Sequence, residues 1–377
     1  MTQEFFNRPF FEWSGYLILL LGFVLTLVIQ LVFYRRVIVA NRASSPNRAE
    51  RPISVLLNVR NESERLEQFL LKLLDQNYSN FEIVVVDDFS ADSTLIILGV
   101  MAKKYPKIKF SSLNQENRYS EKMAMNLAMK AAKNDWVLLL TPETNLDDPD
   151  YLTKMNQELD DDSQMLVSYV NYNTEKAKYN RLCRVERMDA FWRASANQRA
   201  SISLFYQQVN VLFNKQLYFK TGGFKGKMNA HYAGLELVFN QLGKLNVKFS
   251  TALQASLRED RLTDRNEFQD LVKKHIRLFN DIAFSKKWLA WLERLAKLLF
   301  LTGLLTLLLT DIQYWYVFVP IPFVAIIIQA VLIKSMLRCL AEKKIFLSSF
   351  MYVFVRPFLY FYYRASIYLQ LQRNKWN

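Results

Sequence analysis

The sequence contains little cysteine, histidine or glycine. Its 377 residues include 2 Cys, 2 His and 9 Gly. Two cysteines exclude a disulfide framework and a multi-cysteine zinc site, and two histidines exclude a histidine-rich metal centre. No short-range Cys/His spacing indicates a nucleophilic triad. Hydrophobic residues make up 51% and aromatic residues 14%, which excludes a disordered chain. The length allows two domains, or one domain and a membrane part.

The net charge of +14 is unevenly distributed along the chain. Residues 1–50 carry a net charge of +2, residues 51–171 of −6, residues 172–290 of +11 and residues 291–377 of +7. The positive excess therefore increases toward the most hydrophobic part of the sequence. Anionic headgroups attract basic residues next to membrane segments. The pattern predicts contact with anionic membrane lipids and argues against a nucleic-acid partner.

The first apolar segment covers residues 15–34, which include no charged side chain. Twenty such residues can span a hydrocarbon core of about 30 Å. A cleaved signal peptide is the alternative, but the segment is too long, lacks a basic start and precedes no small-residue cleavage site. Four arginines follow the segment: Arg35, Arg36, Arg42 and Arg48. The positive-inside rule then places residues 51 onward in the cytoplasm.

The C-terminal part contains three further apolar stretches. Residues 312–333 form an uncharged run long enough to span, whereas residues 298–310 are shorter and need their apolar flank, with Arg294 and Lys297 snorkelling. Asp311 and Gln313 would then form a tight turn. Residues 345–363 are interrupted by Arg356 and Pro357, which favours a helix lying in the membrane interface over a fourth span. We expect three parts: residues 1–50, 51–290 and 291–377.

The central part alternates strand and helix patterns. The predicted strands are 53–58, 81–86, 108–110 and 136–140, and the predicted helices are 61–74, 94–102 and 122–133. Such alternation indicates an α/β fold with a mostly parallel sheet covered on both faces. Ligands of these sheets bind beyond the carboxyl ends of the strands. Asp87, Asp88 and residues 141–145 fall at those ends.

Several motifs of the central part resemble the family-2 glycosyltransferases. They are Arg60-Asn61-Glu62, Gln76-Asn77-Tyr78, Asp87-Asp88-Phe89-Ser90, the ungapped stretch 121–152, and Thr221-Gly222-Gly223-Phe224. The resemblance implies a glycosyltransferase-A fold, plus transmembrane helices at both ends as in bacterial membrane-anchored members. It also implies a nucleotide-sugar donor, with Asp87 and Asp88 contacting base and ribose and with Arg60 and Lys122 near the donor.

The metal-binding motif of that family is altered here. The family holds a divalent ion with an Asp-x-Asp pair, and hard oxygen ligands suit such an ion. The two Asp positions are Pro142 and Thr144, and only Glu143 between them is acidic. We therefore expect at most a weak Mg²⁺ or Mn²⁺ site, with Glu143 or Asn145 as a ligand. Asp147, Asp148 and Asp150 are interpreted as the solvated start of a helix.

The positions of the catalytic base and the acceptor motif are also altered. About ten residues after the Gly-Gly-Phe turn, where the family has its catalytic base, Glu236 is the sole acid. We interpret Glu236 either as the base or as a surface residue of a helix, and His231 is the alternative base. The family's Gln-x-x-Arg-Trp motif appears as Lys274-His275-Ile276-Arg277-Leu278. Lys274 and Arg277 are the candidate phosphate or acceptor contacts.

Two functions are consistent with these residues. The first is a membrane glycosyltransferase of the bacterial inner membrane, transferring a sugar from a nucleotide-sugar to a lipid-linked or surface-glycan acceptor at the cytoplasmic face. The second is a degenerate glycosyltransferase-like protein that serves as a binding or scaffold subunit of a membrane-protein complex. Metal-dependent nucleotide binding lost in Glu143→Ala would indicate a relocated metal site.

Overall fold

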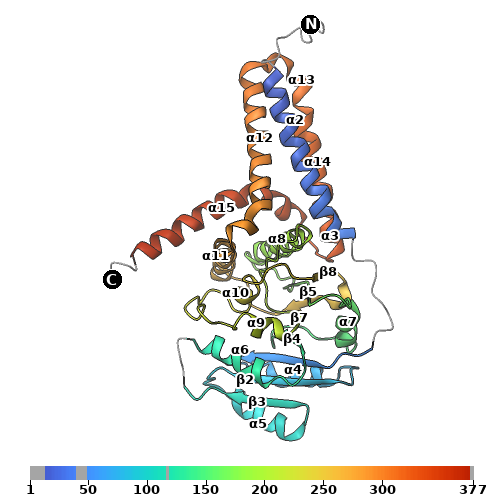
Figure 1. The fold of residues 1–377 in the computed structure, drawn as a ribbon, viewed down its shortest axis with the longest axis vertical. Helices are drawn as coiled ribbons and strands as arrows, with labels where there is room; N and C mark the ends of the chain where they lie inside the picture. Colours follow the sequence, from blue (N-terminus) through green and yellow to red (C-terminus); the bar gives the residue numbers. More distant parts are fainter. Residues whose placement is uncertain (1–12, 40–48, 116–118, 374–377) are drawn as a thin grey trace.

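The computed structural model describes residues 13–39, 49–115 and 119–373. It consists of a globular α/β part and a stalk of helices that rises from one side of it (Figure 1). A long helix, α15 (Phe346–Arg373), crosses between the two parts at the foot of the stalk (Figure 1). Arg42 and Arg48, which contributed to the predicted orientation, lie outside the described residues.

The main sheet has seven strands in the order β3-β2-β1-β4-β7-β5-β8. The strands are β1 (Ile53–Val59), β2 (Phe81–Asp87), β3 (Ile108–Ser112), β4 (Trp136–Leu140), β5 (Met165–Ser168), β7 (Val211–Asn214) and β8 (Val247–Ser250). Only β7 runs antiparallel to its neighbours β4 and β5. A second sheet pairs β6 (Val170–Tyr172) with β9 (Leu257–Glu259). The predicted α/β fold with a mostly parallel sheet is confirmed.

Helices cover both faces of the main sheet. They are α4 (Leu66–Leu74), α5 (Thr94–Lys104), α6 (Ser120–Ala131), α7 (Tyr151–Glu158), α8 (Asn180–Arg199), α11 (Arg265–Asp281) and the short α9 (Gln216–Lys220) and α10 (Glu236–Phe239). Along β1, Val55 and Leu57 belong to one hydrophobic core and Leu56 to the other. This alternation follows from the two-residue period of a strand and explains why β1 is apolar throughout.

The helix predicted over residues 61–74 begins later, at Leu66. Asn61 has a positive φ of 56°, which a helix cannot accommodate. The residues between it and α4 form a turn in which the Leu66 amide donates to the Glu62 carbonyl at 2.9 Å. The acidic residues before α7 lie at the start of that helix, as the sequence predicted. Asp150 is the residue that precedes α7, and Asp147 forms an ion pair with Lys72 at 2.7 Å.

Long helices that run side by side form the stalk (Figure 1). The first is α2 (Ser14–Ile29), continued by a π-helical turn, Gln30–Tyr34, and α3 (Arg35–Val39); the others are α12 (Trp288–Thr310) and α14 (Pro320–Cys339). Among the described residues, two helical segments are long and apolar enough to cross a membrane: Ser14–Ile38 and Ile312–Cys339. The third predicted span is α12, whose first turns carry Glu293, Arg294 and Lys297.

Two glycines bring α2 and α12 into close contact. A Cβ atom on Gly22 would lie 2.3 Å from the Phe300 backbone nitrogen, and one on Gly303 would lie 2.4 Å from the Leu19 backbone nitrogen. Such distances are not compatible with any side chain. Small residues allow helix backbones to approach in membranes, where van der Waals packing drives association. The less apolar α12 is therefore held directly against the most apolar helix of the chain.

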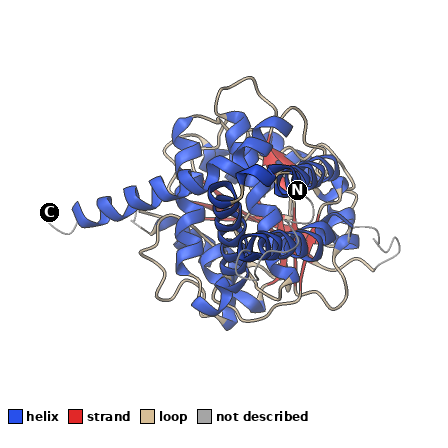
Figure 2. Cartoon of the chain, turned by 90° about the horizontal axis from the view of Figure 1, so that it is seen from above, coloured by secondary structure: helices blue, strands red, loops and turns tan. Residues whose placement is uncertain are grey.

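The final apolar stretch forms one continuous helix, α15 (Phe346–Arg373), with Pro357 inside it. It runs crosswise to the stalk and extends beyond the outline of the other helices (Figures 1 and 2). Arg356 contacts Asp189 of α8 at 3.0 Å. The charge that interrupts the apolar stretch therefore faces the globular part.

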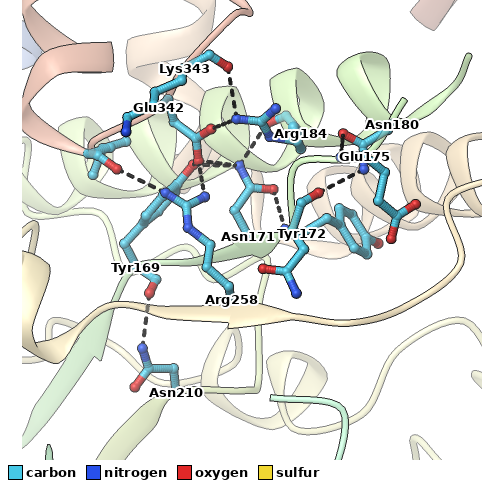
Figure 3. A network of polar contacts seen from close by, with 12 residues as sticks. Tyr169, Asn171, Tyr172, Glu175, Asn180, Arg184, Asn210, Arg258, Glu342 and Lys343 are labelled. Carbon is cyan, nitrogen blue, oxygen red and sulfur yellow. Dashed lines mark hydrogen bonds and ion pairs between the residues drawn. The ribbon is translucent and has the colours of Figure 1, made fainter. Parts of the chain in front are cut away.

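The loop between α14 and α15 is anchored inside the globular part by Glu342 (Figure 3). Its side chain is fully buried and pairs with Arg184 of α8 and Arg258 of β9. The same carboxylate accepts hydrogen bonds from the Tyr169 hydroxyl at 2.8 Å and the Asn171 amide at 2.9 Å. The loop between α14 and α15 is thus attached to the α/β part through a buried ionic cluster.

Candidate functional site

A cavity of about 670 Å³ lies where β1, β2 and β4 end. These strands are parallel, so their carboxyl ends meet at one edge of the sheet. Asn58 of β1, Asp88 after β2 and Thr141 after β4 line the cavity from the sheet side. Lys122 of α6 and His231 of the loop between α9 and α10 also line it. The position matches the one predicted for the ligand.

Four buried oxygen atoms at this edge have no hydrogen-bond donor among the described residues. They are Asn58 Oδ1, Asp87 Oδ1, Asp88 Oδ1 and Thr141 Oγ1. Asp87 and Asp88 are only 2% and 5% exposed. A buried acceptor left unsatisfied costs about 1–3 kcal/mol. Acceptors gathered in this way are typical of a site where a ligand supplies the N–H and O–H donors.

The loops after β1 and β2 are held together by short polar contacts. The Asn61 amide donates to the Ser90 hydroxyl at 2.9 Å, and the Ala91 amide donates to the Asn61 side-chain oxygen at 2.8 Å. Phe89 has a positive φ of 55°, a costly conformation for an aromatic residue. This arrangement fixes Asp88 at the cavity and brings Arg60 to its wall.

The structure places Lys122 at the cavity, but its ammonium group binds a loop. The nitrogen donates to the carbonyls of Lys227 at 2.7 Å, Met228 at 3.3 Å and Ala230 at 2.6 Å. These bonds use all three donors of a lysine, and burial lowers the pKa of this amine. The sequence suggested a contact with the donor; in this structure Lys122 instead positions the loop that carries His231.

The Gly-Gly-Phe turn supports the same loop. Gly222 and Gly223 have positive φ values of 75° and 62°, and a Cβ on Gly223 would lie 2.6 Å from the Tyr218 hydroxyl. Glycine is required there by both conformation and space. The turn buries Phe224, whose ring lies 5.7 Å from the Lys122 nitrogen.

The surroundings of Glu143 do not fit a divalent ion. Burial raises the pKa of this carboxyl although Arg261 opposes the shift, and Arg261 Nε lies 3.9 Å from its Oε1 atom. A guanidinium so close to this carboxylate would repel a divalent ion bound there, because like charges repel. The described residues contain no group of three or more His, Cys, Asp or Glu that could hold a metal.

A second acid, Glu62, also lines this part of the cavity and was not recognised from the sequence. Burial and the neighbouring Glu143 raise the pKa of Glu62, whereas Arg65 and Arg261 lower it. Each of the two carboxylates thus already faces a guanidinium.

Glu236, the predicted base, is fully buried and does not line the cavity. Its carboxylate pairs with Lys274 at 2.6 Å and accepts a hydrogen bond from the Gly234 amide at 3.0 Å. Glu121, in the first turn of α6, is one of the carboxylates that do line the cavity. Although Glu121 is an exposed residue, desolvation by the surrounding protein raises its pKa; Glu236 and Asp88 act in the same direction, and Lys274 opposes them. Its only sequence signal was its position next to Lys122.

The two basic residues of the predicted acceptor motif lie in different environments. Lys274 lines a smaller cavity of about 160 Å³, which shares Thr141, Glu143 and Arg261 with the main one. Arg277 lines neither cavity; its guanidinium lies 5.4 Å from the centre of the Tyr232 ring. The structure brings Lys274 to the site and leaves Arg277 outside it. Arg261, absent from the predicted set, lines both cavities.

The fold is an α/β fold with a cavity at the carboxyl ends of its parallel strands, where sheets of this kind bind their ligands. Residues 54–222 match the family model described as Glycosyl transferase family 2. The resemblance seen in the motifs is confirmed.

Relatives and a solved structure are similar to parts of the chain. The glycosyltransferase GlyG of Streptococcus pneumoniae is 24% identical over 34% of this chain and 42% of its own length. The amylovoran biosynthesis glycosyltransferase AmsB of Erwinia amylovora is 30% identical over 28% of this chain and 34% of its own length. The matches thus span less than half of these relatives.

A mannosyltransferase from Pyrobaculum calidifontis, solved in complex with GDP-mannose and Mn²⁺, has a similar fold. The TM-score is 0.52 at 16% identity, and the match covers 87% of this chain and all of the solved one. This likeness concerns the fold alone.

Proposed function

We propose that the chain is a membrane-bound glycosyltransferase that takes a sugar from a nucleotide-sugar donor and transfers it to a lipid-linked or glycan acceptor. The observation that carries this proposal is the group of unpartnered, buried acceptors at the ends of β1, β2 and β4. The N–H groups of a base and the hydroxyls of a ribose are suitable donors for Asp88 and Asn58. The family-2 domain and the nucleotide-sugar bound by the similar mannosyltransferase support the same ligand class.

The proposed reaction is a single displacement. An acceptor hydroxyl loses its proton to Glu121, its oxygen attacks the anomeric carbon of the sugar, and the bond from that carbon to the diphosphate breaks. The nucleoside diphosphate leaves with the electron pair of that bond. A raised pKa suits a carboxylate that must accept a proton. Glu236 acts indirectly, because it holds Lys274 beside the site.

We also propose that the α/β part lies at the cytoplasmic face of the bacterial inner membrane. The basic ends of two stalk helices, with Arg35 and Arg36 at one and Lys334 and Arg338 at the other, lie toward the α/β part (Figure 1). The positive-inside rule supports this orientation. Large apolar side chains are exposed along α15, among them Leu347, Phe354, Phe358 and Phe361. They suit a helix in the interface beside anionic lipids.

The donor proposal is tested by titrating the detergent-solubilised full chain with UDP- and GDP-sugars in a calorimeter. Binding of one of them is expected, and Asp88→Asn should weaken it at least tenfold. A chain that binds neither would contradict the proposal. Binding with no release of nucleoside diphosphate, in the presence of acceptor lipid extracts, would favour the scaffold function.

Transfer and topology have separate tests. Glu121→Gln should abolish turnover and spare donor affinity, and Glu236→Gln should reduce both turnover and stability; full turnover in Glu121→Gln would exclude it as the base. A reporter fused after Asn377 should be active in the cytoplasm, whereas a periplasmic signal would require α15 to span the membrane.

A further inference from the structure

A guanidinium, that of Arg261, lies beside the turn in which Pro142 and Thr144 occupy the family's Asp-x-Asp positions. This residue follows β9 and lines both cavities, and its side chain is 47% exposed. Its Nε atom is 3.9 Å from Glu143 Oε1, and its Nη2 atom is 3.4 Å from Glu267 Oε2. These distances are longer than those of a tight ion pair. The guanidinium is therefore positioned by two acids and still open to the cavity.

The backbone fixes the position of Arg261 relative to the turn after β4. The Asp260 amide donates to the Glu143 carbonyl at 2.8 Å, and the Asn145 amide donates to the Arg258 carbonyl at 2.7 Å. Thr144 forms an isolated antiparallel bridge with Glu259. The turn that would carry the metal acids is thus hydrogen-bonded to the segment that carries Arg261.

The chemistry of arginine suits this position. The leaving diphosphate of a nucleotide-sugar needs positive charge beside it. A guanidinium carries a permanent charge, and its planar set of N–H donors matches two phosphate oxygens at once. Asp88 and Asn58, whose oxygen atoms are the proposed hydrogen-bond acceptors for the nucleoside, line the same cavity as Arg261. One ligand can therefore contact these acceptors and the guanidinium together. A divalent ion would instead be repelled by Arg261.

We infer that Arg261, rather than a divalent metal ion, binds the diphosphate of the donor. The inference rests on the proposed nucleotide-sugar function and deepens it. Glu143 and Glu267 orient the guanidinium and release it when the diphosphate enters. Donor binding is then independent of Mg²⁺ and Mn²⁺.

The test measures the dissociation constants of UDP, GDP, UMP and GMP for the full-length protein in detergent, with EDTA and with Mn²⁺. EDTA should change the affinity for the bound diphosphate by less than twofold. Arg261→Ala should weaken that affinity at least tenfold and the affinity for the matching monophosphate much less, and Arg261→Lys should be intermediate. Binding of the monophosphate reports that the variant is folded.

Two further variants separate the arginine from a metal site. Glu143→Gln should leave diphosphate affinity unchanged or tighter, because it releases Arg261; a metal held by Glu143 predicts a loss. Arg181→Ala removes an exposed arginine of α8 that lines neither cavity and should behave as the parent chain.

The outcomes are distinguishable. Diphosphate binding that EDTA abolishes and Mn²⁺ restores, with Arg261→Ala unaffected, overturns the inference and leaves the proposed function standing. Absence of binding of every nucleotide overturns the proposed function and the inference with it.

Discussion

Replacing Glu342 with glutamine is expected to destabilise the protein strongly, because it removes the charge that neutralises a buried arginine. The Glu342 side chain is fully buried, and that of its partner Arg184 is 2% exposed (Figure 3). Glutamine preserves the shape but points a neutral amide at the guanidinium. Breaking a buried ion pair on one side costs about 3–5 kcal/mol.

The expected effect is large enough to measure by thermal unfolding of the detergent-solubilised chain. If a unit of about 240 residues unfolds cooperatively, 3–5 kcal/mol lowers its melting temperature by roughly 6–15 °C. Asp161→Asn is the matched control: its carboxylate pairs with Arg51 at 2.8 Å but is 78% exposed. An exposed pair is worth about 0–1 kcal/mol, so this variant should melt within roughly 3 °C of the parent.

A double variant tests the reason for the effect. Glu342→Leu combined with Arg184→Met replaces the buried pair by apolar side chains and should recover most of the lost stability. Arg258 remains, but its side chain is 27% exposed and its Nη2 atom donates to the Leu340 carbonyl at 3.1 Å. A Glu342→Gln protein that melts with the parent would refute the reasoning, as would a double variant as unstable as the sum of its single changes.

Three further outcomes are expected. Gly303→Val should push α12 from α2 and destabilise the stalk by at least 1–3 kcal/mol, seen as faster proteolysis of the solubilised chain; an equal rate would contradict the contact. Turnover should decrease at acid pH with a midpoint above the pKa of an ordinary carboxyl, because desolvation raises the pKa of Glu121 and the base must be ionised. Lys274→Met should move this midpoint to higher pH, since Lys274 lowers the pKa of Glu121. An unchanged midpoint would argue against Glu121 as the base. Lys122→Met should remove the ammonium donor of the Met228 and Ala230 carbonyls, cost about 2 kcal/mol and raise KM more than it lowers kcat. An unchanged KM would mean that the loop does not contribute to binding.

The strands and the site edge could be predicted because their signals are local. The run from Phe81 to Val86 is β-branched and apolar, and the acids after it mark the end of a parallel strand. Composition and length likewise indicated the stalk helices and the crosswise α15. Such features depend on neighbouring residues in the sequence, so no tertiary contact is needed to recognise them.

The roles within the site could not be predicted, because they depend on contacts between distant segments. Lys122 is occupied by carbonyls more than a hundred positions away, and Glu236 is enclosed by Lys274 of another helix. Arg261 follows β9, a three-residue strand that pairs with β6, and no local sequence pattern indicated that Arg261 would lie at the site. A motif position identifies which residue stands there; the fold decides whether its polar atoms remain available.

The close contact of α2 with α12 has a consequence for how the chain is made. Roughly 260 residues separate Ile29 from Trp288, a delay of about 10–50 s at 5–20 residues per second. During that time the surface of α2 around Gly22 has no α12 to pack against. Arg184 and Arg258 likewise have no ion pair with Glu342, which is made later still. The stalk and the arginine cluster are therefore completed only after α12 and Glu342 have been made. A chain released early would carry an open helix surface and two uncompensated arginines, which are features that quality-control proteases can recognise.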